Sequence, residues 1–213
     1  MSKIIRDKTP RRSITGLIDK KLADLKNKQE LRSAGREGNK SADVVFILLD
    51  SSGSMSGDRK ISSAKVGTID YMQKAREKGY QVGLISFGST AQLICKPGSE
   101  NFHEAVAEIT CSGSTNMAEA IRLAVSMLVT PKGRKVVFLV TDGQPDDAEL
   151  ALNEAEKGKK LGVSFMTLGT DDADLAFLSR IATDEKFSAA VETRKLATGI
   201  SSAAKLLEHP RNR

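Results

Sequence analysis

The 213-residue sequence contains no tryptophan, two cysteines, two histidines and 4% aromatic residues. Cys95 and Cys111 are too few for a disulfide framework or a cysteine-based zinc site, so we expect two reduced thiols in a cytosolic protein, with a redox pair as the alternative. No stretch reaches the roughly 18 apolar residues that indicate a transmembrane helix. Residues 1–8 also lack the apolar region of a secretory signal. The sequence therefore predicts a cytoplasmic protein without a transmembrane segment.

The shortage of histidine also weakens most enzymatic interpretations. His103 falls in an expected surface helix and His209 in the C-terminal tail. Residues 53–57 superficially resemble a nucleophile elbow, but Met55 stands where the nucleophile would be. Gly53 is not followed by the Gly-Lys-Ser/Thr of a phosphate-binding loop. A metal-assisted hydrolase stays an alternative, although the pattern offers no positioned general base.

Positive charge is concentrated at the N-terminus. Residues 1–40 contain 12 Lys and Arg against 5 Asp and Glu, a net charge of +7, whereas the whole chain carries +6. The remaining 173 residues therefore have a net charge of −1, and the basic pI belongs to the extension. From Ser13, apolar residues recur at helical spacing, so residues 1–40 are expected to form a basic extension with an amphipathic helix.

The extension permits two hypotheses. It either docks through its apolar face, on its own domain or on a protein partner, or binds an acidic partner, nucleic acid or an anionic membrane. Residues 1–40 contain no aromatic side chain that could stack on bases, which argues against a nucleic-acid-binding adaptor.

Residues 41–213 are expected to form one α/β domain, because apolar strand patterns alternate with helical ones. The three residues 88–90 are too short for a parallel crossover, so the strand that follows them should be antiparallel and lie at an edge. The prediction is a Rossmann-like, doubly wound, mostly parallel sheet with helices on both faces. The expected strands are 43–49, 81–87, 91–94, 134–141, 162–168 and 186–191, and the expected helices are 60–78, 99–108, 117–130, 146–160, 173–182 and 194–208.

Oxygen-bearing side chains gather where two of these strands end. One apolar run ends at Asp50, which is followed by Ser52 and Ser54, and a second ends at Asp142. Thr115 lies in a Ser/Gly-rich loop between them. If the two strands are neighbours at the reversal of strand order, the two carboxylates face one crevice. Hard oxygen ligands on tight turns suit a small hard cation such as Mg²⁺.

This five-residue pattern resembles the metal-ion-dependent adhesion site of the von Willebrand factor type A domain, over roughly residues 42–207. The resemblance implies that Ser52 and Ser54 are direct ligands of Mg²⁺ or Mn²⁺. It implies that Thr115 binds directly or through water, and that Asp50 and Asp142 act largely through water. The remaining position would accept water or a carboxylate from a partner.

Such an ion, held by neutral hydroxyls, stays poorly neutralised and attracts an anionic ligand. We therefore expect a metal-dependent protein-interaction module that binds an Asp or Glu of a partner, and not an enzyme. Residues 141–145 also resemble the corresponding loop of bacterial cytosolic, tellurite-resistance-type members. That resemblance implies an AAA+ ATPase or a phosphosignalling protein as the class of partner. For the adjacent Asp146 and Asp147, the expected role is to cap the next helix, and the alternative is to add negative potential at the rim of the site.

Overall fold

The structure, a computed structural model, describes residues 42–170 and 172–208. The basic extension, residues 1–40, and its expected helix lie outside the described residues, as does His209. No helix in the described part of the chain is long and apolar enough to cross a membrane.

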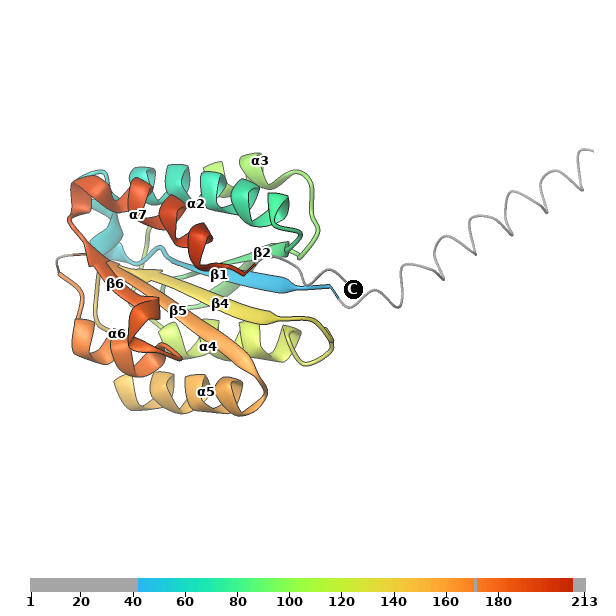
Figure 1. Ribbon diagram of the computed structural model, residues 1–213. Helices are drawn as coiled ribbons and strands as arrows, with labels where there is room; N and C mark the ends of the chain where they lie inside the picture. Colours follow the sequence, from blue (N-terminus) through green and yellow to red (C-terminus); the bar gives the residue numbers. More distant parts are fainter. Residues whose placement is uncertain (1–41, 171, 209–213) are drawn as a thin grey trace, which may run out of the picture. The chain divides into compact units, whose positions relative to one another are not determined.

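A six-stranded sheet forms the centre of the domain (Figure 1). Its strand order is β3-β2-β1-β4-β5-β6, and every neighbouring pair is parallel except β2 and β3. The expected antiparallel edge strand is therefore confirmed as β3. The strands are β1 (Val44–Asp50), β2 (Gln81–Phe87), β3 (Ala91–Cys95), β4 (Lys135–Thr141), β5 (Val163–Thr170) and β6 (Ser188–Val191).

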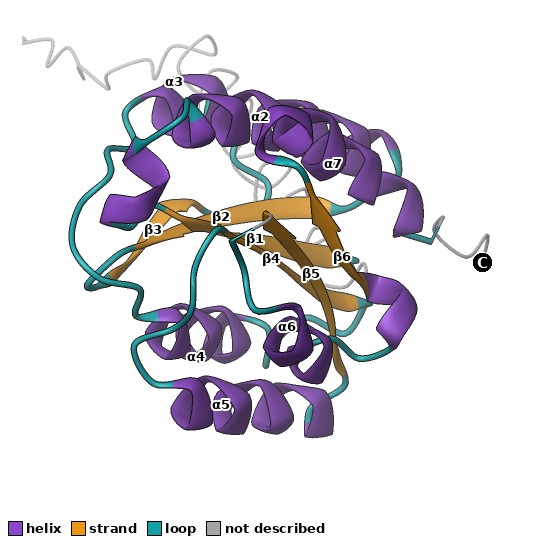
Figure 2. Ribbon diagram, turned by 90° about the vertical axis from the view of Figure 1, so that its left-hand side faces the viewer, coloured by secondary structure: helices purple, strands orange, loops and turns teal. Residues whose placement is uncertain are grey.

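Helices cover both faces of the sheet (Figure 2). One layer contains α2 (Lys60–Glu77), α3 (Phe102–Ala107) and α7 (Leu196–Ala203), and the other contains α4 (Met117–Met127), α5 (Ala148–Lys160) and α6 (Leu175–Ile181). Short 3₁₀ turns complete the described part: η1 (Gly53–Ser56), η2 (Glu185–Phe187), η3 (Thr193–Lys195) and η4 (Ala204–Leu206).

The burial of strand β1 on both faces of the sheet explains its unbroken apolar sequence. Val45 and Ile47 belong to the hydrophobic core under α2 and α7, whereas Val44 and Phe46 belong to the core over α4, α5 and α6. All seven residues of β1 are buried. A parallel strand covered on both faces carries apolar side chains at successive positions, here residues 44–49, and only the terminal Asp50 is polar.

Strands β1 and β4 are neighbours at the reversal of strand order, as the site prediction required. The chain runs outward from β1 to β2 and β3 on one side, and from β4 to β5 and β6 on the other. Ligands of such sheets bind beyond the carboxyl ends of the strands at this point. Asp50 ends β1 and Asp142 directly follows β4.

The expected elements are confirmed, with small differences at their ends. The helix expected at 99–108 begins only at Phe102, because the Ser99 amide bonds the Lys96 carbonyl in a turn where Gly98 has a φ of 85°. The helix expected at 194–208 is divided between η3, α7 and η4.

Candidate metal centre

Asp50 anchors the site at the end of β1. Its side chain turns back on its own loop, where Oδ1 accepts a hydrogen bond from the Ser52 amide at 2.8 Å. Oδ2 accepts one from the Thr141 hydroxyl, the last residue of β4, at 2.5 Å. Burial raises the pKa of the Asp50 carboxyl despite these hydrogen bonds, and the nearby charge of Asp142 adds to the increase. The carboxylate is thus held by neutral donors in a site that disfavours its charge.

The 3₁₀ turn η1 brings two serine hydroxyls to the same place. Ser52 Oγ and Ser54 Oγ lie 3.0 Å apart, and the Ser54 hydroxyl donates to Asp142 Oδ1 at 2.7 Å. Met55, fully buried, fixes the turn in the core, and its amide bonds the Ser52 carbonyl. Hydrogen bonds therefore join these two strand ends into one polar cluster.

The loop that carries Thr115 is fastened to the same turn. The Gly53 amide donates to the Gly113 carbonyl at 3.0 Å, and the Ser112 amide donates to the Ser51 carbonyl at 2.8 Å. Thr115 itself is buried. The structure thus brings the Thr115 loop, from a distant part of the sequence, against the turn that carries the two serines.

Asp146 holds the Thr115 loop, and the expectation that it caps a helix is wrong. Its Oδ1 accepts from the Thr115 amide at 2.9 Å and its Oδ2 from the Ser114 hydroxyl at 2.6 Å. The N-cap of α5 is Asp147 alone, which accepts from the Leu150 amide at 2.8 Å. A helix has one N-cap residue, so only one of the two consecutive aspartates could cap α5.

Sequence reasoning also missed Lys60, the first residue of α2. Its ammonium lies 2.9 Å from Asp142 Oδ2 and 2.8 Å from Asp172 Oδ2. The side chain of Lys60 is 9% exposed, whereas that of Asp172 is 67% exposed. Burial lowers the pKa of Lys60, but the two carboxylates outweigh burial and raise that pKa above its ordinary value.

The donor set fits a hard divalent cation. Hydroxyl and carboxylate oxygens are the ligands that Mg²⁺ and Mn²⁺ prefer, and side-chain hydrogen bonds already join Ser52, Ser54 and Asp142. Within the described ranges, no group of three or more His, Cys, Asp or Glu residues is arranged to hold a metal ion. The candidate centre is instead built from hydroxyls with two supporting carboxylates.

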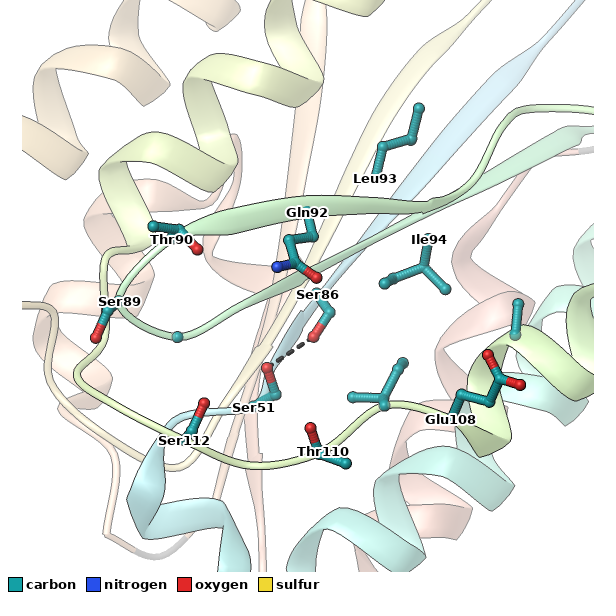
Figure 3. A pocket seen from close by; sticks show the side chains of 13 residues that line it. Ser51, Ser86, Ser89, Thr90, Gln92, Leu93, Ile94, Glu108, Thr110 and Ser112 are labelled. Atoms are coloured by element: carbon teal, nitrogen blue, oxygen red, sulfur yellow. Dashed lines mark hydrogen bonds between the residues drawn. The ribbon is translucent and has the colours of Figure 1, made fainter.

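A polar cavity of about 420 Å³ lies beside the candidate centre (Figure 3). Ser51, between Asp50 and Ser52, lines it and contacts the Ser86 hydroxyl at 2.7 Å. The cavity is walled by Ser51, by residues of β2 and β3 with the turn between them, and by the segment from α3 to Ser112. Three residues considered in the sequence analysis do not line this cavity: His103 lies exposed on α3, and Cys95 and Cys111 are free cysteines.

The chain belongs to the von Willebrand factor type A domain family, whose model matches residues 43–204. Domains of this family often mediate metal-dependent protein–protein interaction and are generally adhesion or interaction modules. Human calcium-activated chloride channel regulator 4 is 26% identical over 135 residues, and an uncharacterised protein of Methanocaldococcus jannaschii is 29% identical over 150 residues. These alignments cover 59% and 67% of this chain, but only 15% and 32% of the curated relatives.

Solved structures share the fold. The pilus adhesin SpaC of Lactobacillus rhamnosus GG matches with a TM-score of 0.69 and 16% identity, over 78% of this chain and 30% of its own. Manganese-loaded TRAP protein of Plasmodium vivax matches at 0.63 and 22%, over 77% and 74%. Mussel proximal thread matrix protein 1, with zinc in its metal-ion-dependent adhesion site, matches at 0.64 and 22%, over 78% and 45%. Such neighbours support a divalent metal as the kind of ion that this fold binds.

Proposed function

We propose that this chain is a protein-interaction module whose adhesion site holds Mg²⁺ or Mn²⁺ and binds a carboxylate of a partner protein. The residues that would hold the ion are Asp50, Ser52, Ser54, Thr115 and Asp142. The observation that carries the proposal is the hydrogen-bonded chain from Ser52 Oγ through Ser54 Oγ to Asp142 Oδ1, with contacts of 3.0 and 2.7 Å.

Each residue has a distinct part in the proposed recognition. The Ser52 and Ser54 hydroxyls bind without adding negative charge, so the ion's remaining charge is available to an Asp or Glu of the partner. The buried Asp142 orients the Ser54 hydroxyl, the buried Asp50 holds the backbone of Ser52, and both balance part of the charge. Thr115, whose loop is held by Asp146, completes the proposed set. Binding and orientation, without turnover, account for every one of these parts.

The class of partner rests on the resemblance of residues 141–145 to tellurite-resistance-type proteins. It extends the proposal to a bacterial cytosolic setting and to an AAA+ ATPase or phosphosignalling protein as the partner. This chain spans a small part of the length of its curated relatives, so the proposal concerns this domain and does not include the activities of those longer proteins.

The test is affinity capture with the purified chain immobilised in Mg²⁺ and eluted with EDTA. Ser54→Ala removes one proposed ligand. Ser56→Ala is the matched control on the same turn, because its hydroxyl bonds only the Gly53 carbonyl among the described residues, at 2.7 Å. We expect partners that EDTA releases from wild type and Ser56→Ala but that Ser54→Ala does not retain. Retention by Ser54→Ala at the wild-type level, or undiminished retention in EDTA, would contradict the proposal.

A further inference from the structure

Lys60 occupies a position that helix energetics disfavour. It is the first residue of α2, where the unpaired amides and the helix dipole create positive potential. The first turn of α2 contains no acidic residue to compensate. A lysine side chain is also seldom buried unless it is paired. Neither the helix nor the hydrophobic core accounts for an ammonium at this place.

The backbone before α2 is arranged around the same position. Asp58 and Arg59 both have left-handed backbone conformations, with φ of 48° and 58°. Non-glycine residues adopt this conformation rarely, and two in succession are stable only where surrounding contacts hold them. The turn that they form ends at Lys60 and directs its side chain to the carboxyl ends of β4 and β5. The ion pairs of Lys60 are therefore among the contacts at the end of this turn.

The contacts of Lys60 place it in competition with a metal ion. Asp142 Oδ1 already accepts from Ser54, and Lys60 engages Oδ2, so both oxygens of this buried carboxylate are occupied. We propose that Lys60 is an internal counter-ion of the adhesion site, which neutralises Asp142, preserves the site without metal and weakens divalent cation binding. This inference rests on the proposed function, because it concerns the affinity of the same site.

Asp172 allows a second test of the proposal, in which the expected change in cation affinity has the opposite sign. Its exposed carboxylate shares the Lys60 ammonium with Asp142 and lies just after β5. Removing Asp172 leaves Lys60 to Asp142 alone and removes one negative charge near the site, so cation binding should weaken. Removing the Lys60 charge should strengthen cation binding. A purely structural lysine would predict no such opposition.

The experiment measures Mg²⁺ and Mn²⁺ affinity by titration calorimetry, and thermal midpoints in EDTA and in Mg²⁺. For Lys60→Met we expect a lower midpoint in EDTA, a larger rise on adding Mg²⁺, and about tenfold tighter cation binding. That factor corresponds to one unit charge a few ångströms from a divalent ion with the screening of bulk water, and the burial of Lys60 and Asp142 can only increase it. For Asp172→Asn we expect weaker cation binding than wild type.

The matched control is Lys74→Met, on the same helix. Lys74 also pairs with an aspartate, Asp70, at 2.8 Å, and contacts the Ser201 hydroxyl, but none of these residues belongs to the site. Its removal should leave cation affinity unchanged. If Lys60→Met is unfolded in EDTA, refolding by Mg²⁺ at concentrations below the wild-type dissociation constant supports the proposal.

Two results would overturn the inference while leaving the proposed function intact. One is a folded Lys60→Met that binds cations no more tightly than wild type, and the other is an Asp172→Asn that binds them as tightly as wild type or more tightly. Cation binding by Lys60→Met but not by wild type would support the counter-ion and contradict the metal-dependent function. Absence of binding in both proteins would contradict both.

Discussion

The two ends of helix α2 each carry a lysine paired with an aspartate, and they differ in almost every other respect. Lys74, near the C-terminal end, pairs with Asp70 four residues earlier, and both side chains are nearly half exposed. Lys60, at the N-terminal end, is buried and pairs with Asp142 and Asp172, which lie 82 and 112 residues away in the sequence. Only the Lys74–Asp70 pair could be predicted from the sequence of the helix alone.

The difference separates residues that serve the helix from residues that serve the site. A cation near the C-terminal end is favoured by the helix dipole, and an Asp–Lys pair four residues apart lies on one helix face. Lys60 opposes the dipole and is removed from water. The start of α5 shows the same contrast, since Asp147 caps the helix and Asp146 instead holds the Thr115 loop.

We expect the largest difference in stability between the two ends of α2 when Asp142→Ala is compared with Asp70→Ala. Removing one partner of a buried ion pair costs about 3–5 kcal/mol, and the remaining contact to exposed Asp172 favours the lower figure. Removing a partner of an exposed pair costs about 0.2–1 kcal/mol. Urea unfolding in EDTA should therefore show a loss of about 3 kcal/mol for Asp142→Ala and under about 1 kcal/mol for Asp70→Ala. Equal losses would show that burial does not distinguish the two ends.

The second comparison uses the neighbouring aspartates before α5. Asp146→Ala removes two hydrogen bonds to the Thr115 loop, so we expect a loss of about 1–2 kcal/mol together with weaker Mg²⁺ binding. Asp147→Ala removes a helix cap at a cost of about 1 kcal/mol. Its Mg²⁺ affinity should equal that of wild type by titration calorimetry. Weakened binding in Asp147→Ala alone would reverse the assignment of the two residues.

The smallest effect concerns pH at the C-terminal end of α2. The hydrogen bond from Lys74, followed by that from Ser201, lowers the pKa of Asp70. A lowered folded-state pKa contributes stability above the unfolded-state value, and that stability is lost as pH falls through the folded-state value. Because the pair is exposed, the contribution should be under about 1 kcal/mol.

Urea unfolding at pH 6 and pH 3 checks this effect. Wild type should lose slightly more stability on acidification than Asp70→Asn, which has no carboxyl group to protonate at this position. Identical pH dependence in the two proteins would show that the Asp70 carboxyl does not contribute to the loss of stability in acid.

Strand patterns made most of the fold predictable. Continuous apolar runs indicated strands buried on both faces, and the short connection between β2 and β3 required an antiparallel pair. The five proposed metal-site residues were identified because two strands end in an acidic residue and because Asp50, Ser52, Ser54, Thr115 and Asp142 together resemble the adhesion-site pattern of the family. Their roles as ligands stay a prediction, and so does the role of residues 1–40.

Sequence reasoning missed Lys60 and gave Asp146 the wrong role for a physical reason. Their partners lie in other segments, so no local pattern joins Lys60 to Asp172 or Asp146 to Thr115. Each nevertheless left a local signal, because a lysine at a helix start and a second aspartate beside an N-cap both lack a helical explanation. Residues that break a local rule without compensation tend to mark functional sites.

Direct titration of the purified chain with Mg²⁺ and Mn²⁺ tests the central claim, that the hydroxyl–carboxylate cluster binds a divalent cation. The account predicts one cation per chain in wild type and in Ser56→Ala, and binding weakened by at least about tenfold in Ser54→Ala, as for loss of one ligand contact of roughly 1.4 kcal/mol. Wild-type protein that binds no divalent cation, or Ser54→Ala that binds it as tightly as wild type, would contradict the account.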